Sequence, residues 1–574
     1  AIVKENANES TYEGFRASIK HEINDDWDAL ATFGTQSIDA DGVFFVDPTL
    51  GDLEIQRYTD DSIEDEYDNM SLTLTGSIGD LEVVYAGAYT DRTSDQNVDY
   101  TDYLFVGQYL PYYICDYYVT YTSFAPGNVP TGSCGAPNLL VDSTTSTEVT
   151  THELRISGPI NDTMSFTAGA FTSDLELKEL NLFNYPGSVG NDITYAPNYA
   201  LTDISSTGAI NNGAAGWFSA GPYSEPVIFF NDIKRTDKQK GIFGEIRMDV
   251  SDTSELTVGA RWYDIEVDFE GSANSSFSNG FGNTDQQKFG TNLSAQYAPG
   301  NAGGYPDKAG SDGVIGKITY SWNPSEDLMY YVTWSEGFRP GLLNRPVGRS
   351  NAAGTYSVKP VVESDEVTNL EFGWKAVLAD GKLRFNGSAF MVDVSGLQTT
   401  VFDPSIVNLF FSDNAADAEI SGVEGDFIYI PEAEGWTISG AFSLLNTEIT
   451  KSLVPTDDIK VGSDLAFAPG IQGNLAARKE WSMASGNTGH YQAQLTWSDD
   501  SFSDVMEPNR AVQDSYSFIN VRAGISNDAW LAEMYIDNIT DERAEINNTF
   551  VFDRQRVGII RPTTLGLRFK RFFN

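Results

Sequence analysis

The feature that most constrains this chain is a unit of two alternating strands joined by a tight turn and followed by a long loop. Its clearest copy covers residues 314–346. From 328 to 335 every second residue lies on the same side, which is the period of a strand with two different faces. One face carries Leu328, Tyr330, Val332 and Trp334. Gly337 and Pro340 then end the strand and begin the loop.

The same unit recurs along the chain. Nine tight turns separate strand pairs, near Asp25, Gly79, Asn161, Asp252, Pro324, Gly381, Glu432, Gly486 and Asp528. A last strand at 564–573 brings the expected number of strands to nineteen. Strands joined by tight turns pair antiparallel. The sequence therefore predicts an all-β fold built on one antiparallel sheet.

The second face of these strands is polar. Between 488 and 497 it consists of Thr488, His490, Gln492, Gln494 and Thr496. A row of inward polar residues is not a close-packed core, but it suits the wall of a wet lumen. We expect His490 to line water. A catalytic or ligand role for it is the weaker alternative, because no Ser, Cys or second His is placed to complete a site.

Apolar runs are only a few residues long, far short of the roughly 18 to 20 that a membrane-spanning helix needs. Only helices and closed barrels satisfy every backbone group in lipid. Short turns that alternate with long loops predict a transmembrane antiparallel β-barrel with periplasmic turns and extracellular loops. Tryptophans near strand ends fit two aromatic girdles; they are Trp27, Trp334, Trp436, Trp497 and Trp530.

Charge excludes one class of partner. The 574 residues include 82 Asp and Glu against 36 Lys and Arg, a formal net charge of −46. Phosphate binding needs a basic footprint, so nucleic acid is not expected as a partner. The acidic stretch at 60–68 is interpreted as a solvated loop, since no spacing matches an EF-hand. No catalytic constellation, metal site or cofactor is predicted, and the chain is not expected to be an enzyme.

Several segments carry a family resemblance. They read HELRISGP at 152–159, WSEGFRPGLLNRP at 334–346, AADAEISGVEGDF at 415–427 and DNITDE at 537–542. Together with residues 363–390, they resemble the barrel portion of TonB-dependent receptors of the Gram-negative outer membrane. The resemblance implies uptake of a scarce nutrient, such as a siderophore, vitamin or glycan, with energy coupled through TonB. A passive porin or a surface-binding barrel is the alternative function.

The resemblance also implies partners, and the residues of the long loops offer a candidate ligand surface. The expected partners are outer-membrane lipid, lipopolysaccharide, TonB through a plug segment, and a small-molecule or oligomeric nutrient. Candidate ligand residues lie in the long loops: Tyr112, Tyr113, Tyr117, Tyr118, Trp217, Phe218, Tyr223, Arg339, Asn344 and Arg345. The arginines suit bidentate binding of an anion. Two alternatives remain open: the tyrosines pack within their own loop, and Arg339 pins its loop to the barrel wall.

Cys115 and Cys134, the only two cysteines, lie in one long loop. This pattern favours a disulfide in an oxidising compartment over two unpaired thiols. Closing a loop of that size restricts the unfolded chain by roughly 3 kcal/mol. No metal site is expected there, because no His lies nearby.

The strand count leads to an expectation about the amino end. Bacterial single-chain barrels have even strand numbers, and plugged transporters have about 22 strands. Nineteen is odd, and residues 1–4 do not read as the start of a signal peptide, although an outer-membrane protein must be exported. Residues 1–574 are therefore expected to be one incomplete barrel domain, with the plug, its TonB-contacting segment and three strands preceding Ala1 or lying in a separate polypeptide.

Overall fold

The computed structural model describes residues 4–101, 132, 138–186, 226–275, 291–401, 406, 410–454, 458–549 and 555–572. Nineteen long strands dominate these residues: β1 (Ser10–Asn24), β2 (Trp27–Asp41), β4 (Ser62–Ile78), β5 (Leu81–Asp99), β6 (Leu140–Asn161), β7 (Met164–Asn184), β8 (Val227–Ser251), β9 (Ser254–Ser275), β11 (Ala309–Ser325), β12 (Leu328–Arg339), β15 (Asp365–Leu378), β16 (Leu383–Val401), β17 (Phe411–Tyr429), β18 (Trp436–Ser452), β19 (Ile471–Ser482), β20 (Thr488–Ser498), β23 (Tyr516–Asn527), β24 (Trp530–Asp537) and β27 (Thr564–Arg571).

Short elements lie in the connections: β3 (Phe45–Val46), β10 (Thr291–Asn292), α4 (Leu293–Gln296), β13 (Leu342–Leu343), β14 (Val361–Val362), β21 (Ser501–Phe502), η4 (Glu507–Asn509), β22 (Val512–Gln513), β25 (Glu545–Thr549) and β26 (Arg556–Ile559). No helix in the described part of the chain has the length and apolarity to cross a membrane.

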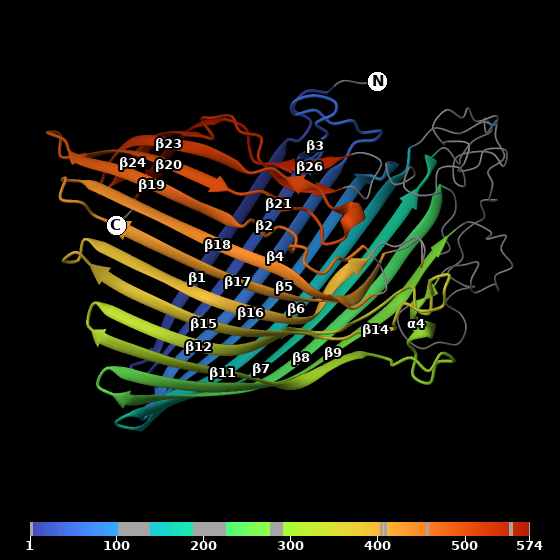
Figure 1. Ribbon diagram of the computed structural model, residues 1–574, viewed down its shortest axis with the longest axis horizontal. Coiled ribbons are helices and arrows are strands. Elements are labelled where there is room, and N and C mark those ends of the chain that lie inside the picture. The colour runs from blue at the N-terminus through green and yellow to red at the C-terminus, as the bar shows by residue number, and fades with distance from the viewer. Residues whose placement is uncertain are drawn as a thin grey trace.

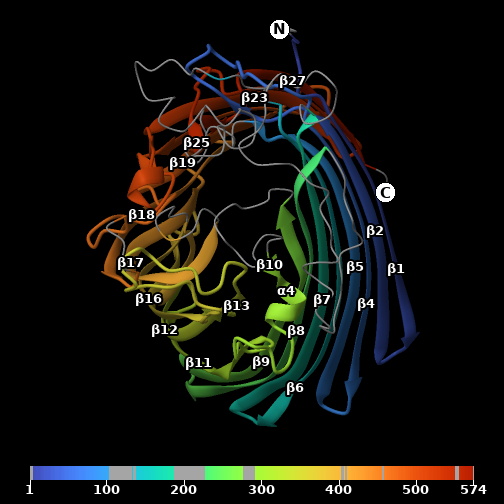
Figure 2. The ribbon, with the colours of Figure 1, turned by 90° about the vertical axis from the view of Figure 1, so that its right-hand side faces the viewer.

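The nineteen long strands and β10 belong to one sheet, which confirms the predicted all-β antiparallel fold and its number of long strands. Each long strand pairs antiparallel with its neighbour in the chain, as β11 does with β12. The tight turns gather at one end of the sheet, here named the turn end, and the long connections gather at the opposite loop end (Figure 1). Seen from the loop end, the strands curve into a ring around α4, β10 and β13 (Figure 2).

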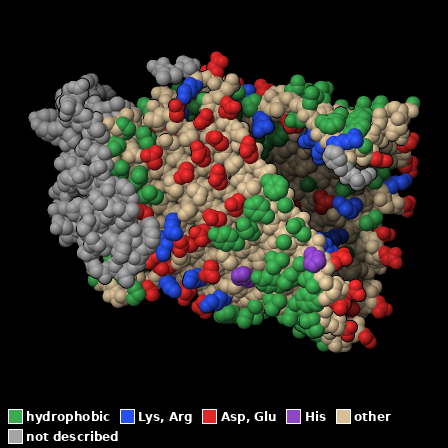
Figure 3. All heavy atoms as spheres, turned by 180° about the vertical axis from the view of Figure 1, so that it is seen from behind, with side chains coloured by type: hydrophobic (Ala, Val, Ile, Leu, Met, Phe, Trp, Pro, Cys, Tyr) green, Lys and Arg blue, Asp and Glu red, His purple; other side chains and the backbone are tan. Residues whose placement is uncertain are grey.

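The outward face carries rows of apolar side chains. Every second residue of a strand points outward, and the register brings the outward residues of successive strands side by side. Ile318, Trp334, Leu370 and Met391 are directly opposed in register across four strands. All four are exposed although they are large and apolar. Apolar patches of this kind cover part of the outer surface (Figure 3). A surface of this kind suits hydrocarbon.

Small residues let large ones lie flat on the sheet. Tyr331 is opposed to Gly373, and a Cβ at Gly373 would lie 2.1 Å from a ring carbon of Tyr331. The ring of Tyr331 lies over Gly373, and its hydroxyl donates to Oε1 of Glu371, on the same strand as Gly373, at 2.5 Å. Glycine at this position is thus a packing requirement of the wall.

The prediction that His490 lines water is wrong. His490 is 2% exposed, and its Nε2 lies 2.9 Å from Glu533 Oε2. His490, Gly524 and Glu533 are opposed in register on β20, β23 and β24. Because Gly524 has no side chain, His490 and Glu533 meet over the strand between them. Glu533 also accepts a hydrogen bond from Arg568 Nη1 at 3.2 Å, so the histidine belongs to a buried polar row.

The first and last parts of the chain are tied together at the loop end. β3 pairs with β26, which pairs with β25. Two guanidinium groups lie against the ring of Phe45, with Arg57 Cζ at 5.5 Å and Arg556 Cζ at 5.2 Å from its centre. By contrast, β1 pairs only with β2 and β27 only with β24 among the described residues. The expectation of further strands stays a prediction.

One outward row of acidic side chains should lower the stability of the sheet by a measurable amount. Asp68, Asp91 and Glu148 are directly opposed on β4, β5 and β6, all three exposed. Acidic side chains are spread over this outer face (Figure 3). Directly opposed like charges destabilise a sheet. We expect Asp91→Asn to raise the free energy of unfolding by about 0.5 kcal/mol at low salt, measured by urea titration of the refolded barrel.

The matched control for this prediction is Asp174→Asn. Asp174 is opposed to Thr150 and Lys238, so removing its charge relieves no repulsion and should leave stability unchanged or slightly lower. The gain from Asp91→Asn should shrink in molar salt, because salt screens exposed charges. An equal gain at low and high salt would refute the electrostatic explanation.

Candidate functional site

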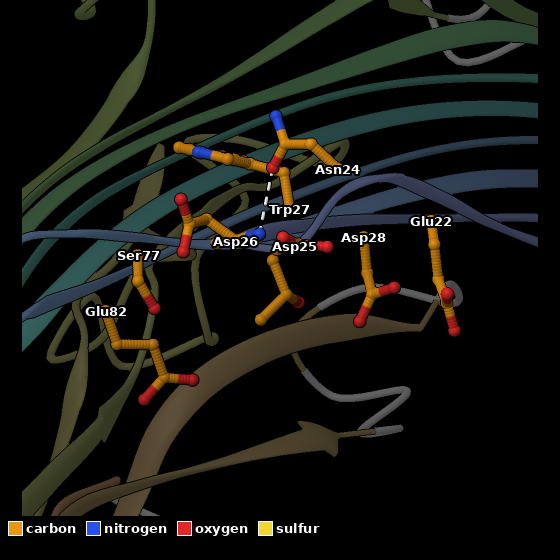
Figure 4. A pocket seen from close by; sticks show the side chains of 10 residues that line it. Glu22, Asn24, Asp25, Asp26, Trp27, Asp28, Ser77 and Glu82 are labelled. Carbon is orange, nitrogen blue, oxygen red and sulfur yellow. Dashed lines mark hydrogen bonds between the residues drawn. The ribbon is translucent and has the colours of Figure 1, made fainter.

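One cavity lies at the turn end, opposite the predicted ligand loops. It measures about 720 Å³. Figure 4 shows Glu22, Asp26, Asp28 and Glu82 around it, with the amide of Asp26 donating to Asn24 Oδ1 at 2.9 Å. No cluster of His, Cys, Asp and Glu suited to a metal ion occurs in the described ranges. The cavity is an acidic opening at the turn end and supports no metal assignment.

At the loop end, Asn344 holds two loop segments against a strand. Its Nδ2 donates to the carbonyl oxygens of Lys359 at 3.0 Å and Ser412 at 2.8 Å. Its Oδ1 accepts from the amide of Ser412 at 3.0 Å. Asn344 is only 3% exposed. Both ends of this amide are thus committed to the fold, and we name the arrangement the Asn344 clasp.

A buried tyrosine, Tyr297, hydrogen-bonds to the backbone of the Asn344 clasp. Tyr297, which follows α4, donates its hydroxyl to the carbonyl oxygen of Asn344. Burial raises the pKa of Tyr297 well above its usual range. The phenol therefore remains a donor at neutral pH. Tyr263 and Phe338 stack nearby with ring centres 3.7 Å apart, in the same apolar cluster as Leu343.

Arg339 is held by Asp365, the first residue of β15. Arg339 Nε donates to Asp365 Oδ2 at 2.7 Å, and its Nη2 also contacts this oxygen. The amide of Arg339 donates to Asp365 Oδ1 at 3.0 Å. Asp365 is 1% exposed, whereas 55% of the Arg339 side chain is exposed. Arg339 therefore pins its loop to the wall and still presents its outer edge to solvent.

Arg345 reaches a different strand. Its Nη1 donates to Asn231 Oδ1, and its Cζ lies 5.9 Å from the ring centre of Phe229. Both partners belong to β8. The three loop residues predicted from sequence, Arg339, Asn344 and Arg345, thus bind β15, β17 and β8 respectively. We name these three residues, which tie one loop to three separate strands, the frame at the loop end.

The DNITDE segment builds a second clasp. Asn538 Nδ2 donates to the carbonyl oxygens of Glu542 at 2.9 Å and Arg561 at 3.1 Å. Asn538 and Asp541 have φ of 51° and 54°, in the left-handed region that Asn and Asp tolerate better than most residues. Arg543 donates to both Asp541 and Asp52, and Asp52 lies 491 positions before Arg543 in the chain. Hydrogen bonds from Arg543 and Thr563 hold the pKa of Asp541 below its usual range.

The other predicted ligand residues lie outside the described residues: Tyr112, Tyr113, Tyr117, Tyr118, Trp217, Phe218 and Tyr223. The predicted disulfide of Cys115 and Cys134 lies outside them as well. Sequence reasoning missed Asp365 and Tyr297. Arg339 and Asp365 are directly opposed on β12 and β15, two strands that are joined by a long loop. No local sequence signal predicts the register of these two strands.

Comparisons with known proteins agree with this architecture. The family model described as TonB dependent receptor-like, beta-barrel matches residues 10–539. The structure of the ferric yersiniabactin uptake receptor FyuA from Yersinia pestis is similar, with a TM-score of 0.68 at 12% identity over 98% of this chain and 71% of that one. The siderophore receptor PiuA from Acinetobacter baumannii gives 0.64 at 17% identity, over 99% and 74%.

A third similar structure is the ferripyoverdine receptor of the outer membrane of Pseudomonas aeruginosa. Its TM-score is 0.61 at 14% identity, over 98% of this chain and 65% of that one. At such identities these three structures establish a shared fold. Comparison of the sequence with curated proteins gave no match.

The Asn344 clasp can be tested on its own. Asn344→Ala removes three hydrogen bonds of a buried side chain, which at roughly 1 kcal/mol each should cost about 3 kcal/mol of local stability. We expect faster hydrogen exchange at Ser412 and faster proteolysis within 345–360, with the barrel still assembled. Asn323→Ala, at an exposed position near the end of β11, is the control and should change neither. Unchanged exchange at Ser412 would contradict the role of the clasp.

Proposed function

The chain belongs to the family of TonB-dependent receptor β-barrels, and from this membership we propose that its loop end captures a scarce nutrient whose entry into the lumen is driven through TonB. The chain is a nutrient-uptake receptor of the Gram-negative outer membrane and not an enzyme. In this orientation the loop end is extracellular and the turn end is periplasmic. The family match along residues 10–539 is the observation that carries the proposal.

We propose a ferric siderophore as the ligand class to test first. The support is that structural neighbours of this chain are named as receptors for ferric yersiniabactin and ferripyoverdine. Vitamins and glycans are the remaining candidates within the same mechanism.

The proposed ligand surface combines the frame at the loop end with the aromatic loops. Arg339 contributes an exposed guanidinium edge, which suits an anionic ligand. Asn344 contributes indirectly, because it fixes the loop that carries both arginines. The aromatic residues proposed to contact ligand remain Tyr112, Tyr113, Tyr117, Tyr118, Trp217, Phe218 and Tyr223. Contact of TonB through a plug segment, and contacts of the outward face with lipid and lipopolysaccharide, belong to the same proposal.

Energy coupling separates the receptor from its rival, a passive porin. We expect cells that express this protein to take up ferric siderophore, and we expect uptake to fall to the background of a receptor deletion when the inner-membrane energy complex is removed. Radioactive iron uptake from a panel of siderophores measures this, with vitamins and glycans as parallel panels. Uptake that persists without the energy complex would defeat the receptor proposal.

A second prediction concerns the arginines. Arg339→Ala removes the proposed ligand contact and also breaks the ion pair between Arg339 and Asp365. Asp365→Asn is the matched control, because it weakens the same ion pair but keeps the arginine. We expect ligand affinity to fall about tenfold or more with Arg339→Ala, as for a lost charged hydrogen bond, and to fall less with Asp365→Asn. Arg345→Ala should likewise lower affinity without reducing barrel assembly.

Binding assays with washed cells and quantification of assembled barrel give the two readouts. Equal losses of affinity in Arg339→Ala and Asp365→Asn would assign Arg339 to loop pinning alone. Loss of assembled barrel in Arg345→Ala would give that residue a structural role instead.

A further inference from the structure

A shallow groove interrupts the wall at β20, β23 and β24. It measures about 270 Å³. Its outward lining consists of Tyr491, Ala493, Val521, Ala523, Met534 and Ile536. The remaining lining residues, Gln492, Arg522 and Tyr535, alternate with these along the same strands. Ala493 and Ala523 are the smallest outward side chains, so the floor of the groove lies at their positions.

Strand register gives the groove a direction. Tyr491, Ala523 and Met534 are opposed in one row, and Ala493, Val521 and Ile536 form the next row toward the loop end. Tyr491 lies three residues after the start of β20, close to the turn end. The groove therefore runs from the periplasmic boundary of the wall toward the middle of the membrane.

An aromatic and basic cluster stands at the periplasmic end of the groove. Trp436, Lys479 and Tyr491 are directly opposed on β18, β19 and β20. The rings of Trp436 and Trp481 each lie 5.8 Å from that of Tyr491. Tryptophan and tyrosine at this height are typical of the membrane interface.

Lys479 gives this cluster an uncompensated positive charge. Its Nζ donates to the carbonyl oxygen of Glu434 and lies 5.9 Å from the ring centre of Trp436. Both contacts are to uncharged groups, a backbone carbonyl and an indole ring. The adjacent Glu480 pairs with Arg478 at 2.8 Å, and no ion pair in the described part of the chain includes Lys479. Lys479 thus presents an outward positive charge at the interface of a chain whose net charge is −46.

We propose that this groove binds one anionic glycerophospholipid of the periplasmic leaflet. The phosphate lies against Lys479 beside Trp436 and Tyr491, and one acyl chain lies over Ala493 and Ala523. Charge complementarity selects the headgroup, and the apolar floor, at the depth of the hydrocarbon, selects the chain. The lipid would cover the outward surface of three strands next to β27, whose far edge has no partner among the described residues.

Native mass spectrometry of the full chain in detergent, titrated with phosphatidylglycerol, tests the proposal. We expect one tightly retained lipid. Lys479→Gln should weaken its binding about fivefold, as expected for one basic residue at a membrane surface. Ala523→Phe fills the floor and should weaken it at least as much. The cold-gel mobility of each variant checks folding, and Lys479→Gln decides the question if Ala523→Phe does not fold.

Two controls match these variants. Arg571→Gln removes another outward cation near the turn end, opposed to Trp530, and Ala532→Phe adds the same bulk outside the groove lining. Both should bind phosphatidylglycerol as the wild type does. Equal weakening by Arg571→Gln would indicate general surface charge and overturn the proposal. A dimer that forms through this face and excludes the lipid would overturn it as well.

Discussion

The hydrogen bonds of one antiparallel ladder are the constraint on which this structure depends. Hydrocarbon supplies no water, so the backbone groups of each strand must be satisfied by neighbouring strands. Nineteen long strands do this within a single sheet. Because the ladder uses only the backbone, the side chains are left to build two unlike surfaces, one facing lipid and one facing a lumen.

The side chains are organised by rows that cross the strands at equal height. At mid-height the row from Ile318 to Met391 is apolar and exposed. Toward the loop end, Asp68, Asp91 and Glu148 place three carboxylates side by side. Near the turn end, Trp436, Lys479 and Tyr491 form an aromatic and basic row. The outer wall thus changes chemistry with depth, as a membrane does.

Irregular backbone at the loop end is satisfied by side chains instead of a ladder. Asn344 and Asn538 each hold two separate carbonyl groups, and Asp365 holds both the amide and the guanidinium of Arg339. These polar residues hold the loop backbone in one conformation. They place the exposed edge of Arg339 relative to the ring, which a free loop of the same sequence could not do.

The sequence by itself determined the nineteen long strands, their tight turns and their two faces, because period-2 alternation and turn chemistry are local signals. It also singled out Arg339, Asn344 and Arg345, whose loop position is visible from glycine and proline. Only the tertiary structure decided their partners. Asp365 and Asn231 meet them across long loops, and nothing in a long loop fixes strand register. His490 was misjudged for a related reason: its contact with Glu533 needs Gly524 opposed between them, and that alignment exists only in the assembled sheet.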